Sequence, residues 1–177
     1  MVGWLRSHPV LTVVLPLVAV AAIGLGIYWF APQRLVLDRE VSEAPPTSSP
    51  TAGTSAGAAV DDPVVEPIEL SSGTFRSLEH ETTGTARIVE AGDGSRFVRL
   101  EDLDTSDGPD LRIYLTDQPV SDDWHVWDDR SYVDLGALKG NVGDSNYRVP
   151  NHVELNDYRT VVIWCRRFTV GFAVAPI

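Results

Sequence analysis

Residues 160–172 read TVVIWCRRFTVGF, the strongest β-strand pattern in the chain. Most of these residues are β-branched or aromatic, the types that suit a pleated, half-buried strand. Alternation places two sets of side chains on opposite faces, Val161, Ile163, Cys165 and Arg167 on one and Val162, Trp164 and Arg166 on the other. Cys165 is the only cysteine in the chain. The stretch therefore predicts a strand and marks its thiol as the candidate for any chemistry.

Shorter runs of the same kind occur from about residue 68 onward, separated by turn residues. They cover residues 74–78, 85–90, 96–101, 111–116, 132–135, 146–149, 160–166 and 168–174. Asp93-Gly94 predicts a β-hairpin between the second and third runs, and the alternation in 111–116 predicts one solvent-facing side. Seven to eight short strands, with turns roughly every ten residues, predict an all-β antiparallel sandwich or barrel over residues 68–177.

Residues 10–30, VLTVVLPLVAVAAIGLGIYWF, contain no charged side chain. A helix of this length reaches about 30 Å, the thickness of a bilayer core, and the aromatic residues 28–30 suit a membrane interface. A cleavable signal peptide is the alternative, but cleavage after residues 19–21 would leave an apolar tail. We therefore expect a transmembrane signal-anchor helix at 10–30, preceded by a cytoplasmic tail at 1–9.

Residues 31–67 are rich in Pro, Ser, Thr, Ala and Gly, with few side chains to bury. This composition predicts a flexible stalk. Arg6 precedes the apolar segment, whereas Arg34 and Arg39 follow it, so the positive-inside rule gives almost no orientation. The stalk is the reason to expect a single-pass protein of the cell membrane with its C-terminal domain outside the cytoplasm.

Acidic residues outnumber basic ones by 25 to 14, giving a formal net charge of -11, and every acidic residue follows Leu37. Such a surface repels phosphate backbones, so we expect no nucleic-acid partner.

The sequence lacks the ligand patterns of the common metal and haem sites. An EF-hand loop beginning at Asp102 would need Gly and Glu where Asp107 and Ile113 stand, although a looser calcium site in 101–110 stays open. No His or Met follows Cys165, as blue copper would require, and neither a C-x-x-C-H motif nor a paired zinc spacing occurs. We expect no metal site.

Non-covalent haem stays open, because four side chains could supply an axial ligand. These are His80, His125, His152 and Cys165.

Four motifs follow one another from Gly73 to Ala173. They are GTFRSLEHETTGTARI (73–88), GPDLRIYL (108–115), YVDLGALKGNVGDSNYRVP (132–150) and YRTVVIWCRRFTVGFA (158–173). Together they resemble the DM-13 domain family, often called the electron-transfer DM-13 domain. The resemblance implies an all-β extracellular or membrane-tethered module, in which the cysteine of a W-C-x-x-F motif works in redox chemistry, bare or as ligand to a prosthetic group. Cys165 matches that position. The family's domain is sometimes joined to DOMON and cytochrome-type domains; because this chain carries neither, the resemblance implies a redox protein partner.

We therefore expect a membrane-anchored extracytoplasmic domain with an electron-transfer role through Cys165. His80, in the matching H-E-T-T-G-T-A run, is a supporting candidate as ligand or proton partner, and Arg167 as the neighbour that favours a thiolate. The alternative is a non-catalytic binding or cell-envelope module in which Cys165 is a buried core residue. Whether the domain is an enzyme stays open. Exposure and pKa of the thiol separate the two hypotheses, because a redox cysteine is accessible and has a lowered pKa.

Overall fold

The computed structural model describes residues 9–30, 38–47 and 66–177. The chain divides into two units, Met1–Leu37 and Asp38–Ile177. Among the described residues, the first unit contains a helix and the second contains the strands.

Helix α2 spans Pro9–Phe30, with Pro16 inside it. Apolar side chains such as Leu17, Val20 and Leu25 are exposed on it. Within the described residues, no helix meets the length and hydropathy that crossing a membrane requires. The expected helix at 10–30 is thus present as a helix, while its membrane-spanning role stays a prediction. The tail expected at 1–9 lies outside the described residues except for Pro9.

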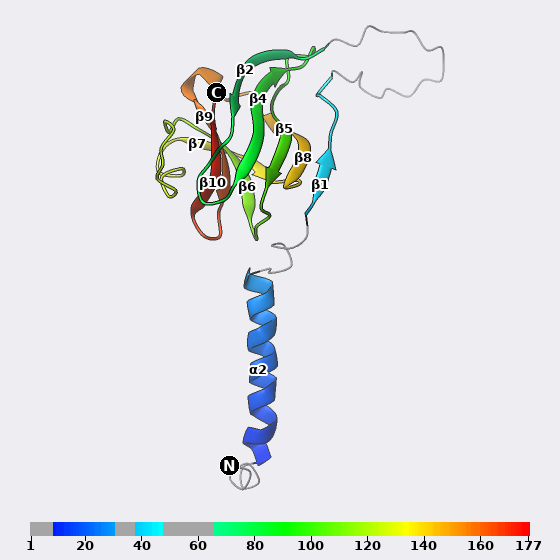
Figure 1. Ribbon diagram of the computed structural model, residues 1–177, viewed down its shortest axis with the longest axis vertical. Helices are drawn as coiled ribbons and strands as arrows, with labels where there is room; N and C mark the ends of the chain where they lie inside the picture. The colour runs from blue at the N-terminus through cyan, green and yellow to red at the C-terminus, as the bar shows by residue number, and fades with distance from the viewer. Residues whose placement is uncertain (1–8, 31–37, 48–65) are drawn as a thin grey trace, which may run out of the picture. The chain divides into compact units, whose positions relative to one another are not determined.

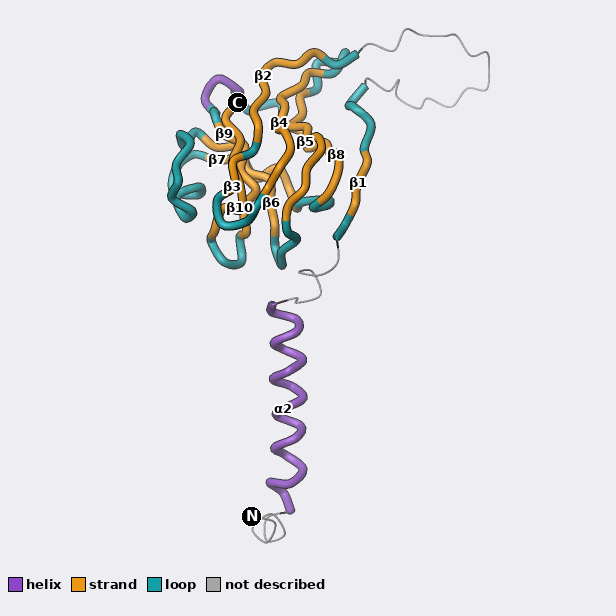
Figure 2. Tube along the Cα trace, in the orientation of Figure 1, coloured by secondary structure: helices purple, strands orange, loops and turns teal. Residues whose placement is uncertain are grey.

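In the described part of the second unit, two five-stranded sheets pack into a sandwich (Figures 1 and 2). The strand order is β1-β8-β5-β4-β2 in one sheet and β3-β10-β9-β6-β7 in the other. The strands are β1 (Glu40–Ser42), β2 (Ile68–Thr74), β3 (Arg76–Ser77), β4 (Thr82–Glu90), β5 (Arg96–Thr105), β6 (Leu111–Thr116), β7 (Tyr132–Ala137), β8 (Val142–Val149), β9 (Thr160–Cys165) and β10 (Val170–Pro176). A short 3-10 helix covers Leu155–Asp157. The predicted all-β sandwich is confirmed. The expected run at 74–78 contains the short β3, whereas β1 and β2 are added to the expected strands.

The hairpin predicted at Asp93-Gly94 joins β4 to β5. Gly94 has φ +77°, a conformation that glycine adopts without penalty. The Asp93 carboxylate accepts the Ser95 backbone N–H at 2.8 Å, and the Ala91 N–H donates to the Ser95 carbonyl at 2.8 Å. The local turn residues therefore fix this register without help from the rest of the fold.

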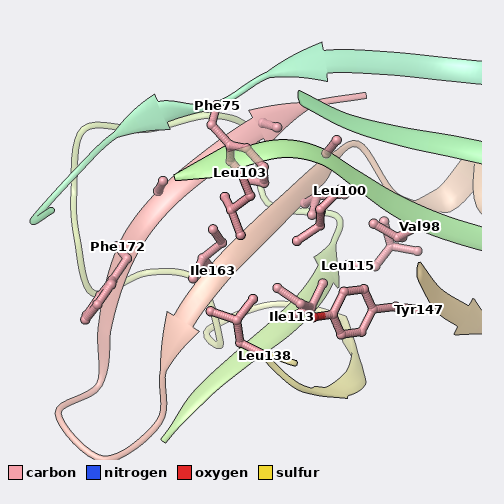
Figure 3. Close-up of a cluster of buried hydrophobic side chains, with 14 of the residues drawn as sticks. Phe75, Val98, Leu100, Leu103, Ile113, Leu115, Leu138, Tyr147, Ile163 and Phe172 are labelled. Atoms are coloured by element: carbon pink, nitrogen blue, oxygen red, sulfur yellow. The ribbon is translucent and has the colours of Figure 1, made fainter. Parts of the chain in front are cut away.

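The main core lies between the two sheets, where alternate residues of both inner faces meet (Figure 3). Val98 and Leu100 of β5 face Ile113 and Leu115 of β6 and Ile163 of β9 in this layer. All six residues of β9 are buried, so this strand is covered on both sides. That burial explains why the 160–165 stretch reads as an almost continuous apolar run.

A second apolar cluster covers the outer face of β6 and β9. Trp127, in the loop between β6 and β7, is fully buried there, together with Tyr114 and Trp164. The prediction that 112, 114 and 116 face solvent is therefore wrong for Tyr114 and Thr116, which are buried. Alternation correctly showed which residues share a face, but it could not show that the loop between β6 and β7 covers this face.

Residues 38–47, which we call the N-terminal strap, lie along the edge of the sandwich. β1 pairs in parallel with β8, with Val41 opposite Gly143. A Cβ on Gly143, which has φ +97°, would lie 2.1 Å from the Val41 carbonyl oxygen, so glycine allows the close approach. The predicted flexible stalk is wrong for this segment. The other stalk residues, apart from Glu66 and Pro67, lie outside the described residues.

Charged groups fasten the strap to the sandwich. Arg39 donates from Nε and Nη2 to the two carboxylate oxygens of Asp107, at 2.9 and 3.0 Å, and the Asp107 side chain is 1% exposed. Glu43 accepts from Lys139 Nζ at 2.8 Å and from the Asn146 backbone N–H at 2.7 Å. The sequence analysis did not predict these contacts. The composition of a Pro- and Ser-rich segment does not show which of its few charged side chains has a buried partner.

Arg39→Ala tests the strap. It leaves the buried Asp107 carboxylate without its charged partner, and we expect the free energy of unfolding to fall by about 1–3 kcal/mol. Arg130→Ala is the control, because Arg130 and Asp117 are 3.9 Å apart and Arg130 is exposed, so its loss should cost less than about 1 kcal/mol. Denaturant unfolding measures both. Equal effects would show that the pair between Arg39 and Asp107 stabilises the fold no more than an exposed ion pair does.

Candidate functional site

Cys165 is the last residue of β9, between Val170 of β10 and Leu111 of β6 in the paired strands. Its side chain is 0% exposed and belongs to the core between the sheets, with Val161 and Ile163. The predicted division of faces is confirmed for β9, since Val162 and Trp164 lie in the outer cluster. Residues 166–169, which we call the closing turn, then lead into β10.

Burial raises the pKa of the Cys165 thiol above its ordinary value, because a thiolate is poorly solvated in the core. Backbone hydrogen bonds from Phe168, Arg167 and Asp110 lower the pKa but offset only part of this effect. The prediction that Arg167 shares a strand face with the thiol is wrong. The strand ends at Cys165, and Arg167 lies in the closing turn. In this structure the thiol is neither accessible nor of lowered pKa.

His80 lies close to the core that surrounds the thiol. Its ring centroid is 3.9 Å from that of Phe172, a buried residue in the same core cluster as Cys165. Its Nε2 is 3.2 Å from a carboxylate oxygen of Glu79. His80 thus borders the core cluster that includes Cys165, but no hydrogen bond joins these two described residues.

Two other segments hold the closing turn and the start of β10. The Gly171 backbone N–H donates to the Trp124 carbonyl at 2.7 Å, and His125 Nδ1 lies 2.6 Å from the Thr169 carbonyl. Because a carbonyl only accepts, Nδ1 of His125 carries the proton in this contact. On the other side, the Leu78 N–H donates to the Phe172 carbonyl at 2.8 Å. Hydrogen bonds from two separate segments therefore hold the closing turn and the start of β10 in place.

Gly171 is a contact point that the sequence reasoning missed. A Cβ there would lie 2.8 Å from Trp127 Cδ1 and 2.9 Å from Leu78 Cδ1, so only glycine allows the loop and the strand to approach this closely. A glycine inside a strand pattern, between Val170 and Phe172, was the available signal. The sequence alone does not show that Trp127 and Leu78 are the side chains that approach Gly171.

The residues around Cys165 do not fit a haem. The sulfur is fully buried, and of the two cavities considered, about 520 Å³ beside Leu70 and about 400 Å³ beside Asp117, neither is lined by Cys165 or a histidine. His80 packs against Phe172 with its ring tilted, His125 contacts the closing turn, and His152 is exposed after β8. The four proposed ligands thus have separate surroundings. Among the described residues, no group of three or more His, Cys, Asp or Glu side chains is arranged to hold a metal ion.

The acidic stretch 101–110 is used in ion pairs. Glu101 pairs with Arg99 at 2.7 Å and Asp110 with Arg166 at 2.9 Å, while Asp107 pairs with Arg39 of the strap. Three of its carboxylates thus bind guanidinium groups, which removes the basis for a calcium loop here.

The raised thiol pKa predicts a pH-dependent stability. The folded chain holds the Cys165 proton more tightly than the unfolded chain, so stability is unaffected well below the ordinary thiol pKa, about 8.5, and is lost as pH rises from there through the folded-state pKa. The wild type should therefore lose stability relative to Cys165→Ala between pH 7 and pH 10. Denaturant unfolding of both proteins measures the difference. A constant difference, or one that changes in the opposite direction, would contradict the buried neutral thiol.

A family model described as "Electron transfer DM13" matches residues 74–177, more than half of the chain. This region contains β3 to β10 and Cys165. Neither the curated proteins nor the solved structures gave a match. On the extent of the match, the chain belongs to the electron transfer DM13 family.

Proposed function

We propose that this chain is a membrane-anchored, extracytoplasmic electron-transfer module that uses Cys165 as its redox group and keeps the thiol shielded while the closing turn is shut. The observation that carries the proposal is the position of Cys165 at the very end of β9, beneath a four-residue turn. From this position we infer that displacement of the turn can expose the sulfur while the two sheets stay together. Membership of the electron transfer family gives the general role.

While the turn is shut, the thiol cannot take part in exchange, because the thiolate is the nucleophile and burial disfavours it. When the turn opens, water solvates the thiolate, and it can attack a disulfide of a redox partner protein. One sulfur of that disulfide bonds to Cys165, and the other leaves as a thiolate. Because the chain has no second cysteine, the product is a mixed disulfide with the partner and never an internal bridge.

Labelling of the full-length protein in detergent tests this function. A small thiol reagent is applied at pH 8 in low concentrations of urea, and the labelling rate of Cys165 is measured. If opening of the turn exposes the thiol, the rate should depend on urea much more weakly than global unfolding does, because a local opening exposes little surface.

Ser131→Cys in a Cys165→Ala background is the matched control. Ser131 is exposed, so its replacement should label at the rate of a free thiol at every urea concentration. If Cys165 instead reacts only with the full urea dependence of global unfolding, the proposed redox role fails.

A non-catalytic binding or cell-envelope module is the second candidate. Its specific support is the complete burial of Cys165 together with the raised thiol pKa, which suit a core residue that packs as a small hydrophobe. Under this candidate, Cys165→Ala would leave every cellular phenotype unchanged, and labelling would occur only through global unfolding.

The proposed anchor is the apolar segment at residues 10–30. Its support is the uncharged sequence and the exposed apolar side chains around α2, because a helix that is apolar all round belongs in an apolar environment. The strand-containing unit begins at Asp38 rather than at residue 68, so the strap is kept with this unit in the test below.

Deletion of residues 1–37 tests the anchor. The full-length chain should stay in membranes washed at alkaline pH, whereas the shortened chain should be soluble and keep its thermal stability, because it retains the strap. A chain shortened to begin at Ile68 is the comparison and should be less stable. Extraction of the full-length chain by the alkaline wash would contradict anchoring.

A further inference from the structure

Three aromatic side chains form a row across the second sheet, from its centre to its edge. Trp164 of β9 lies opposite Arg112, two residues from Tyr114 on β6, and Tyr114 lies opposite Asp134, two residues from Tyr132 on β7. Such diagonal positions bring large rings within reach of one another. The Trp164 and Tyr114 centroids are 6.2 Å apart, and those of Tyr114 and Tyr132 are 4.6 Å apart with planes stacked at 14°. We call this row the aromatic ladder.

The ladder joins the protein interior to solvent. Trp164 is 0% exposed, Tyr114 is 3% exposed and Tyr132 is 42% exposed, so exposure rises along the row. Trp164 immediately precedes Cys165 in the chain, although the two side chains lie on opposite faces of β9. The ladder is therefore a continuous ring-to-ring path from the strand that carries the thiol to the surface at the edge strand β7.

The surroundings of Trp164 suit a reversible loss of one electron. Among the described residues, its buried Nε1 has no hydrogen-bond partner. An oxidised indole becomes acidic, and a nearby acceptor would remove its N–H proton. With no acceptor, the oxidised ring keeps that proton and can be reduced again without a proton transfer. A buried indole N–H without a partner is unfavourable for stability, and Trp127 of the same cluster has one too; Trp164 differs from Trp127 in its place on the ladder.

We propose that Trp164, Tyr114 and Tyr132 conduct an electron from the buried end of β9 to a strong one-electron oxidant, of the high-valent haem or organic-radical class, held against Tyr132. The inference deepens the proposed electron-transfer function and rests on it. In one passage the oxidant gains one electron, and Trp164 loses one to become an indole cation radical that keeps its proton. Each tyrosine gives up one electron and then regains one, so both tyrosines end the passage in their starting redox and protonation states.

The alternative is that the three rings only stabilise the sheet, as cross-strand aromatic pairs commonly do. Phenylalanine separates the two roles. Tyr114→Phe keeps a ring of the same shape in the row but removes the phenol, so packing is preserved while the ring becomes far harder to oxidise. A structural role predicts almost no effect on electron movement, whereas conduction predicts its loss.

Photo-oxidation of the full-length protein gives a direct test. A ruthenium tris-bipyridine complex is attached through Ser131→Cys, next to Tyr132, and is selective because Cys165 is buried. After a flash with an electron acceptor, absorption spectroscopy follows the indole radical, and Trp164→Phe identifies the part of the signal that comes from Trp164. We expect that part to be lost in Tyr114→Phe and in Tyr132→Phe.

Tyr158→Phe is the matched control, because Tyr158 is a partly buried tyrosine outside the ladder, and the Trp164 radical should persist in it. Thermal unfolding of each variant checks that the fold is retained. If the Trp164 signal is unchanged in Tyr114→Phe, or never forms in the parent, the ladder does not conduct. The same flash experiment in Cys165→Ala should still give the radical, so failure of the thiol hypothesis and failure of the ladder are distinguished.

Discussion

Burial of β9 on both faces is the constraint on which the rest of the domain depends. Val161 and Ile163 pack into the core between the sheets, whereas Val162 and Trp164 require a second cover on the outside. The loop after β6 supplies that cover through Trp127, and Gly171 makes room for it. A strand with two apolar faces is stable only when both are removed from water. The loop is therefore part of the fold.

The same burial decides the chemistry available to the only thiol. Cys165 lies fully buried in the inner core, where the thiolate is disfavoured, and the adjacent closing turn and the start of β10 are held by hydrogen bonds from two other segments. Backbone N–H groups directed at the sulfur favour the charged form but do not prevail. Redox chemistry at this position therefore needs either an opening of the turn or a path for electrons through the protein.

Ion pairs and charged hydrogen bonds hold the strap at the β8 edge of the sandwich, whereas apolar contacts hold the two sheets together at its centre. Arg99, almost fully buried, binds Glu101 and Asp144 and also donates to the Glu43 carbonyl of the strap. Together with the pair between Arg39 and Asp107, this network covers the edge strand β8 with a parallel partner. An edge so covered offers less unpaired backbone to other chains.

The sequence by itself determined most of the strands, the β4–β5 hairpin and the division of faces in β9, because alternation and turn chemistry are local properties. It also determined the family, through motifs that include Cys165. Only the tertiary structure decided that Tyr114 is covered, that residues 38–47 belong to the sandwich, and that Cys165 has a raised pKa. Each of these depends on contacts between segments far apart in the chain, such as Asp107 with Arg39. Burial of a thiol is a property of all its neighbours together, and no window of sequence contains them.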